Sequence, residues 1–163
     1  MENDEKCFST TRIGNAFEDL CVEWLKKYLR EKDPSLAEKL TICQRKPLKG
    51  RSGASYNFDI VVEGPGIFLP SGNEGDVLCV AECKYRGFAV ETRDVCAFIF
   101  YERDINAPHA LFFYAGHITQ SCCLLLRHHG ITPVDLTEEF SRSAIFRRYQ
   151  RRSNRESGKE RAV

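Results

Sequence analysis

A glutamate and a lysine stand two residues apart at the end of an apolar run, in the segment Glu82-Cys83-Lys84. Side chains alternate between the two faces of a β-strand, so Glu82 and Lys84 share one face and Cys83 takes the other. Burying a carboxylate and an ammonium costs free energy unless they have partners or a chemical task. A single aspartate, Asp59, interrupts a second apolar run. If the two strands are neighbours, Asp59 lies beside Glu82, and two carboxylates meet one ammonium.

This set of groups suits the hydrolysis of a phosphodiester. Two close carboxylates repel each other and bind hard cations such as Mg²⁺ or Mn²⁺ through oxygen. A bound cation polarises a phosphoryl oxygen and lowers the pKa of a water molecule. Lys84 would orient that water or stabilise the negative charge that builds on the phosphate. We therefore expect Asp59 and Glu82 to be metal ligands, with the backbone carbonyl of Cys83 as a further ligand and its thiol pointing away.

A third carboxylate is a candidate for the same site. Glu18 lies at the edge of the apolar face of a predicted helix, and such a position can face a cleft beside the sheet. An ordinary glutamate at the boundary of the core explains Glu18 equally well. The alternative for Asp59, Glu82 and Lys84 is a structural ion-pair cluster near the end of a sheet.

Basic residues gather in the sequence around the two motif strands, and they are candidates for contacts with phosphates, although each is also compatible with an ordinary surface charge. The expected nucleic-acid-binding residues are Lys46, Lys49, Arg51, Ser52, Arg86 and Arg93. From Arg142 to the end, eight Lys/Arg and two Glu give a net charge of +6, which leaves −5 for residues 1–141. A basic tail on an acidic body suggests contact with a polyanion, or a solvated chain end.

The hydrophobic pattern predicts the elements that must position these residues. A helix is expected over residues 13–31, capped by Thr10 or Thr11, with a short helical turn at 35–39. A loop or irregular hairpin is expected over 64–76, before a central strand. The predicted strands are 40–45, 56–62, 77–85, 110–115 and 131–136, and the later helices are 92–104, 119–128 (ended by Gly130) and 137–152. The order α-β-β-β-α-β-α-β-α predicts an α/β fold with a mixed central sheet flanked by helices.

The composition fits one α/β domain over residues 1–150, followed by a basic, flexible tail over 151–163. No apolar run approaches the roughly 20 residues needed to span a bilayer, and the polar, acidic N-terminus does not resemble a secretory signal. We therefore expect a cytoplasmic protein without membrane contact or an organic cofactor. Eight cysteines, none with CxxC spacing, are expected to be mostly small buried side chains.

The order Asn57-Phe58-Asp59, a loop and Glu82-Cys83-Lys84 resembles the restriction-endonuclease-like nuclease superfamily, whose signature is PD-(D/E)xK. The resemblance implies a restriction-endonuclease-like fold in which Asp59 and Glu82 bind Mg²⁺ or Mn²⁺ and Lys84 acts in catalysis. It also implies that Glu18 is the helical glutamate found in many members. It also implies DNA as the substrate. Cutting two strands usually calls for a homodimer. A nuclease fold without turnover, which binds nucleic acid or a partner protein, is the alternative.

Two branches of the superfamily look similar to this chain. The segments from Gly14 through Glu18 and around Arg45, Ser52-Gly53 and the motif resemble archaeal Holliday-junction resolvases. The segments 110–114 and 130–135 resemble Mrr-type restriction endonucleases. The proline of the signature and the glycine-rich motif of Mrr-type enzymes are absent, and Glu-Cys-Lys replaces Gln-x-Lys. The sequence therefore predicts a DNA endonuclease of restriction, repair or recombination type, and it leaves the preferred DNA structure, and DNA against RNA, open.

Overall fold

The computed structural model describes residues 2–65, 76–85, 89–144, 146–147 and 150, with residues 2–11 described by their backbone alone. Five strands form one sheet in the order β1-β2-β3-β4-β5. The elements are α1 (Glu2–Lys32), α2 (Pro34–Ala37), β1 (Thr41–Lys49), β2 (Ser55–Gly64), β3 (Asp76–Tyr85), α3 (Thr92–Ile105), β4 (His109–Ala115), α4 (Gln120–His128), β5 (Thr132–Asp135) and α5 (Thr137–Arg142).

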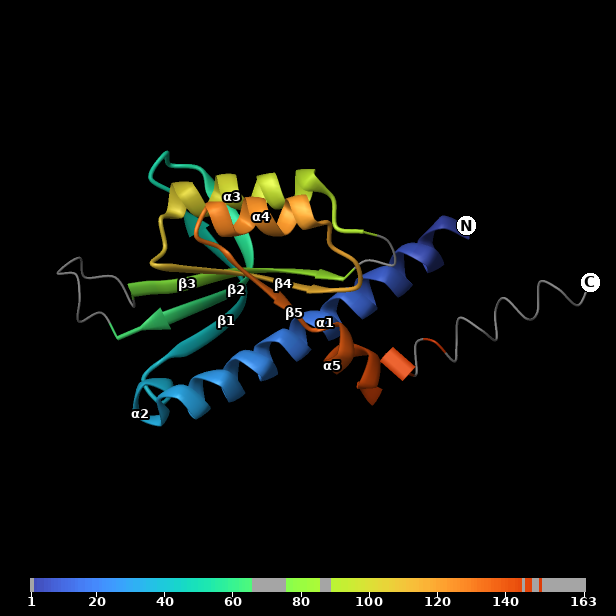
Figure 1. Ribbon diagram of the computed structural model, residues 1–163, viewed down its shortest axis with the longest axis horizontal. Helices are drawn as coiled ribbons and strands as arrows, with labels where there is room; N and C mark the ends of the chain where they lie inside the picture. Colours follow the sequence, from blue (N-terminus) through green and yellow to red (C-terminus); the bar gives the residue numbers. More distant parts are fainter. Residues whose placement is uncertain (1, 66–75, 86–88, 145, 148–149, 151–163) are drawn as a thin grey trace, which may run out of the picture.

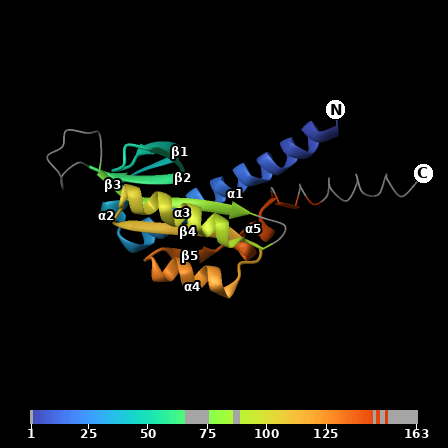
Figure 2. The ribbon, with the colours of Figure 1, turned by 90° about the horizontal axis from the view of Figure 1, so that it is seen from above.

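The sheet is mixed because its two halves are connected differently. β1, β2 and β3 pair antiparallel, whereas β3, β4 and β5 pair parallel through the crossover helices α3 and α4. β3 lies at the centre, as its apolar beginning predicts. Helix α1 covers one face of the sheet, and α3 and α4 cover the other (Figures 1 and 2). The predicted α/β class and mixed sheet flanked by helices are thus confirmed.

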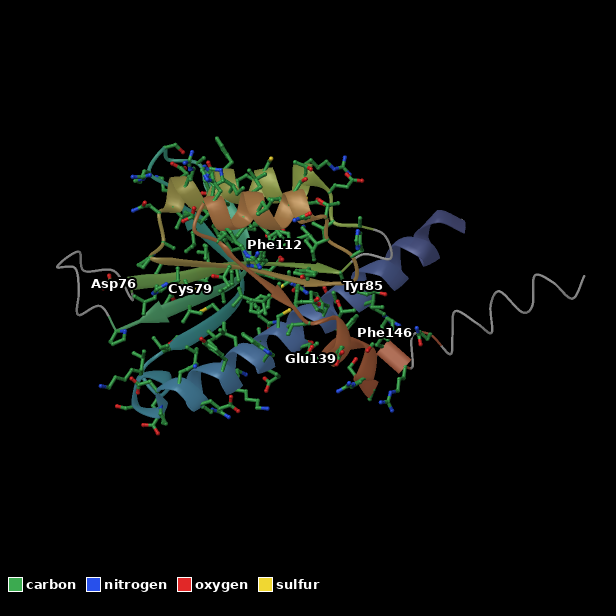
Figure 3. All side chains as sticks on the ribbon, viewed as in Figure 1. Asp76, Cys79, Tyr85, Phe112, Glu139 and Phe146 are labelled. Carbon is green, nitrogen blue, oxygen red and sulfur yellow. The ribbon has the colours of Figure 1, made fainter. Side chains whose placement is uncertain are left out.

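The core has one half on each face of the sheet. On the α1 face, Phe17 and Cys21 pack against Ala81 and Phe113. On the other face, Phe112 lies between the sheet and the layer of α3 and α4 (Figure 3). Side chains alternate along β3 between the two halves of the core, and this alternation places Val80, Glu82 and Lys84 toward α3.

The β1–β2 hairpin is sharply bent, and no sequence signal predicted the bend. Phe58 packs on the α3 face against Phe98, while Ile60, two residues later, packs on the α1 face. Regular alternation would put both on one face, so β2 changes orientation at Asp59. On β1, Arg45 has a left-handed backbone with φ 51°. The pairs Gln44↔Ile60 and Lys46↔Phe58 place Arg45 opposite Asp59, so both strands bend at this point.

Beyond the bend, the tip of the hairpin lies against the C-terminal end of α3. The backbone amide of Arg51 donates to the carbonyl of Asp104 at 3.0 Å. The amide and hydroxyl of Ser52 donate to the Asp104 carboxylate at 2.9 and 2.5 Å. Gly50 is buried beneath them. The carboxyl group of Asp104 fills the space where a side chain at position 50 would begin.

We expect Gly50→Ala to lower the melting temperature by several degrees, because the added methyl displaces Asp104 from Ser52. Gly14→Ala is the matched control. Gly14 lies within α1 with open space around it, so alanine there should raise stability slightly. Thermal unfolding followed by circular dichroism measures both. Equal melting temperatures for Gly50→Ala and the wild type would show that the tip is not held as described.

Some predicted boundaries are wrong. α1 begins at Glu2 rather than at residue 13, and Thr10 and Thr11 lie inside the helix rather than capping it; residues 2–12 contain no proline or glycine to stop it. β1 runs on to Lys49. α5 ends at Arg142, not at 152, because Ser143 is extended and its hydroxyl accepts from the amide of Phe146, as at the start of a new helical turn.

The remaining expectations concern the loop, the tail, the cysteines and the membrane. Residues 66–75 and 151–163, with most of the expected loop and the tail, lie outside the described residues. Cys21, Cys79, Cys83 and Cys122 are buried free thiols, as expected, while Cys96 is exposed. In the part of the chain that the structure describes, no helix combines the length and apolar character needed to cross a bilayer.

Candidate active site

β2 and β3 are neighbours, as the predicted site requires. Their register pairs Ile60, which follows Asp59, with Ala81, which precedes Glu82. Next to this pair, the side chain of Asp59, and not the backbone of β2, accepts the hydrogen bond from β3. Its Oδ2 accepts a hydrogen bond of 2.7 Å from the backbone amide of Cys83. The bend in β2 and this hydrogen bond fix the Asp59 carboxylate beside the Glu82-Cys83-Lys84 segment.

Glu82 and Lys84 form an ion pair on the α3 side of β3. Lys84 Nζ lies 2.6 Å from Glu82 Oε1, and the side chains are 27% and 16% exposed, respectively. They are therefore shielded from water yet still accessible. Cys83 is buried on the opposite face with Cys21, so its thiol points away from Glu82 and Lys84, as the alternation of the strand predicts.

The C-terminal end of β3 is anchored by aromatic rings. Tyr85 packs on Phe140 of α5, with ring centroids 5.0 Å apart, and on Phe146 at 6.1 Å (Figure 3). Phe17 of α1 approaches the same ring at 6.4 Å. These contacts restrict the residue that follows Lys84, so the ion pair stands on a rigid strand end.

The electrostatics of the site are those of carboxylates crowded out of water. Burial first, and then the charge of Asp59, raise the pKa of Glu82 to about 7 against the opposing effect of the Lys84 ammonium. Burial also raises the pKa of Asp59, against the hydrogen bond from Cys83 and the charge of Lys84. Burial lowers the pKa of Lys84, but the carboxylates of Glu82 and Asp59 outweigh burial and leave it raised. The carboxylates thus hold their charges at a cost that a cation would relieve.

Glu18 lies on the other side of Asp59. Its Oε2 is 2.9 Å from Arg45, whose guanidinium also contacts Asn15. Burial raises the pKa of Glu18, with a further contribution from the charge of Asp59. Because α1 covers the face opposite α3, Glu18 approaches Asp59 from the side away from Glu82. The structure therefore brings Glu18 near Asp59, already paired with Arg45.

Sequence reasoning missed Asp94. It is the third residue of α3, where its side chain and that of Glu91 form a capping box. Its negative charge acts on both Glu82 and Lys84. One signal was available: a helix that follows a parallel strand begins near the C-terminal end of that strand, so its first turn reaches the motif.

The donor set fits a magnesium ion bound by two carboxylates. Asp59 Oδ1 and Glu82 Oε2 take part in none of the hydrogen bonds or ion pairs found among the described residues. Within those residues, no three His, Cys, Asp or Glu side chains are grouped as a ready-made metal site. Mg²⁺ is commonly held by one or two carboxylates, with water and substrate phosphate completing the shell. The hard oxygen donors of Asp59 and Glu82 meet that requirement.

The expected nucleic-acid-binding residues are dispersed rather than grouped around the site. Two are held by carboxylates: Lys46 lies 2.7 Å from Glu63, and Arg93 lies 3.1 Å from Glu91. The others that the structure describes lie at the hairpin tip: Lys49 is exposed, and Arg51 and Ser52 contact the end of α3. Arg86 lies outside the described residues.

Comparisons with known proteins place few limits on function. No family model matches the chain, and no curated protein matches it. Among solved structures, a crystal structure titled as that of a protein of unknown function, AF1548, is similar with a TM-score of 0.47 and 13% identity. The similar region covers 69% of this chain and 56% of that one, so this chain spans little more than half the length of that protein. The class established by the structure is an α/β protein with a mixed five-stranded sheet.

Proposed function

We propose that the protein is a divalent-metal-dependent endonuclease that hydrolyses phosphodiester bonds in DNA, with a restriction-endonuclease-like fold. The observation that carries the proposal is the meeting of Asp59, Glu82 and Lys84 at the bend of β2. Two carboxylates with raised pKa values and an ammonium are expensive to hold together in a purely structural role. The PD-(D/E)xK resemblance assigns the same three residues.

In this function, Asp59 and Glu82 would hold Mg²⁺ or Mn²⁺, with the carbonyl of Cys83 as a further ligand. When bound, the cation polarises a phosphoryl oxygen and lowers the pKa of a water molecule. The ammonium of Lys84 donates a hydrogen bond to a phosphoryl oxygen and stabilises its growing negative charge. The amide of Cys83 keeps the Asp59 carboxylate in place during this process. Glu18 holds Arg45 in an ion pair, and Arg45 lies opposite Asp59 on β1, so Glu18 helps to position the bend.

The direct test is cleavage by the purified protein. Plasmid, branched and single-stranded DNA are incubated with Mg²⁺ or Mn²⁺, and parallel reactions contain EDTA. We expect cleavage that depends on the metal and on Asp59 and Lys84. If Asp59→Ala and Lys84→Ala cleave as well as the wild type, any nuclease activity resides elsewhere and the assignment is wrong. Analytical ultracentrifugation of the same samples tests the homodimer that cutting both strands would require.

A second candidate is a subunit with the same fold that binds DNA or a partner protein without turnover. The 2.6 Å pairing of Lys84 with Glu82 favours this candidate, because a lysine neutralised by a glutamate on the same strand is also a stable structural arrangement. Binding of DNA that weakens steeply with salt, with no metal-dependent cutting, would support this candidate over the first.

Metal affinity should depend on pH in a defined direction. Because the pKa of Glu82 is raised to about 7, that carboxyl is mostly protonated below neutral pH and competes poorly for a cation. We expect Mg²⁺ affinity to rise about tenfold between roughly pH 6 and pH 8. Isothermal titration calorimetry measures it, with Glu82→Gln as the control that removes the dependence.

The metal-free protein should show the opposite trend. A carboxyl whose pKa is higher in the folded than in the unfolded state binds more protons when folded, so stability falls as pH rises from the ordinary glutamate value of 4.5 to about 7. Saturating Mg²⁺ should reverse this loss. A flat pH profile for Mg²⁺ affinity in the wild type would show that Glu82 is not a ligand.

A further inference from the structure

Three aromatic rings meet where the hairpin tip lies on α3. Tyr56 stacks on Tyr101, with centroids 4.7 Å apart and an interplanar angle of 25°. Phe100 meets both rings edge-on, at 6.4 Å from Tyr56 and 6.2 Å from Tyr101. Phe100 is nevertheless 65% exposed, more than any other exposed large hydrophobic side chain among the described residues. Its neighbours restrict the ring while leaving most of it to solvent.

Cationic residues lie on the same two segments as this cluster, the hairpin tip and the end of α3. Arg51 Nη2 donates to the backbone carbonyl of Arg103 at 2.7 Å, a contact with a neutral acceptor. Arg103 is in the last turn of α3, close enough to α4 for its charge to act on His129. Lys49 is exposed at the end of β1.

Carboxylates nearby offset only part of this charge. Asp104 is occupied with the hydroxyl and amide of Ser52. Glu102 is partly buried, and its charge is countered by Arg103 and Arg51. With Lys49, Arg51 and Arg103 against these two carboxylates, the exposed side of the cluster keeps an excess of positive charge.

An exposed aromatic ring among cations is the arrangement that binds unpaired nucleotides. Bases stack on the ring and the cations contact the backbone, with little dependence on sequence. An anionic membrane would require an apolar stripe along the helix. The exposed residues of α3 around Phe100 include Arg93, Cys96 and Arg103 and form no such stripe. The chemistry therefore favours a single-stranded nucleic acid.

The cluster also lies within reach of the candidate active site. Asp94, beside Glu82, and Arg103 are nine residues apart on α3, or about 14 Å along the helix axis. That distance corresponds to roughly four nucleotides of a stacked strand. A strand that runs along α3 would therefore connect the two places.

We propose that Phe100, Tyr101 and Tyr56, with Arg51 and Arg103, form a platform that binds a single-stranded segment of nucleic acid. Its use in cleavage rests on the proposed endonuclease function. In that case the substrate carries unpaired nucleotides a few positions from the cut, as a flap, branch or frayed end does, because a base within a duplex is not free to stack on Phe100.

Binding is measured without metal, so that cleavage plays no part. Fluorescence anisotropy follows a labelled oligothymidylate and a hairpin duplex of the same length, in EDTA, with the full chain. Phe100→Ala is expected to weaken oligothymidylate binding by about 5- to 150-fold, the range for one stacked base, and duplex binding much less. Phe100→Trp should restore the affinity. Leu124→Ala, which removes a 58% exposed side chain from α4, is the matched control and should bind like the wild type.

Several results would overturn the platform. One is wild-type oligothymidylate affinity in Phe100→Ala. Another is a loss of affinity in Leu124→Ala, or for the duplex in Phe100→Ala, as large as the loss for oligothymidylate in Phe100→Ala. The third is binding of the protein to anionic vesicles but not to the oligonucleotide. Loss of oligonucleotide affinity in Phe100→Ala, in a protein that cleaves no DNA, would support the platform and refute the nuclease. Cleavage of flap and duplex DNA at wild-type rates by Phe100→Ala would support the nuclease and refute the use of the platform in cleavage.

Discussion

Lys84→Ala is expected to lower the rate of metal-dependent DNA cleavage by roughly 100- to 1,000-fold, the usual loss when one preorganised donor to a developing negative charge is removed. Lys84 stands 2.6 Å from Glu82 on a strand end held by aromatic packing, so its ammonium is held at a fixed place beside the carboxylates. The alanine variant should remain folded, because the 27% exposed side chain leaves room for water in its place.

Two further variants separate a catalytic from a structural role. Lys84→Arg keeps the charge but changes its shape and reach, so we expect cleavage between that of the wild type and the alanine variant. Lys27→Ala removes an exposed lysine that is paired with Glu31 at 3.8 Å, and it should cleave at the wild-type rate. Single-turnover rates at saturating metal give the comparison. If Lys84→Ala unfolds at a much lower temperature and its folded fraction cleaves normally, the ion pair is structural.

Loss of Lys84 also has a consequence for pH. Lys84 opposes the rise in the pKa of Glu82, so its removal should shift the pH dependence of Mg²⁺ binding upward. Residual activity of Lys84→Ala should therefore increase more steeply with pH than that of the wild type. A profile parallel to the wild type would show that the two groups do not interact in solution.

The parts of the site that could be predicted are those governed by strand alternation. Glu82 and Lys84 had to share a face once residues 77–85 formed a strand, and Cys83 had to face away. The meeting of Asp59 with Glu82 needed one more condition, that the two strands pair, and a hairpin supplies it. These conclusions depend only on the pleat and on nearest neighbours in the sheet.

The rest depended on contacts between distant segments. Nothing in the local sequence marks Arg45 for a left-handed backbone, which is uncommon outside glycine. Contacts of the hairpin tip with Asp104 and of Arg45 with Glu18 accompany that conformation. The bend that aims Asp59 at the amide of Cys83 therefore could not be predicted. The same holds for the contact of Phe100 with Tyr56, which joins α3 to a distant hairpin.

The bend also explains why Asp59 should respond differently to two substitutions. Its carboxylate accepts a hydrogen bond from the Cys83 amide and supplies negative charge to the site. Asparagine keeps an oxygen that accepts the hydrogen bond from this amide, but it removes the charge. Alanine removes both, and it leaves the amide of a buried residue without its acceptor, which costs about 1–3 kcal/mol.

We therefore expect Asp59→Asn and Asp59→Ala to lose cleavage equally, by roughly 1,000-fold or more, because each removes a proposed metal ligand. Their stabilities should diverge. Without metal near neutral pH, Asp59→Asn should be as stable as the wild type or more so, since the charge that raises the pKa of Glu82 is gone and the Glu82–Lys84 pair is relieved. Asp59→Ala should be less stable than Asp59→Asn. Urea unfolding with and without Mg²⁺ measures both effects, and Mg²⁺ should stabilise the wild type alone. A marked loss of stability in Asp59→Asn would mean that the fold requires this carboxylate, and the free-energy argument for an active site at the bend would fail.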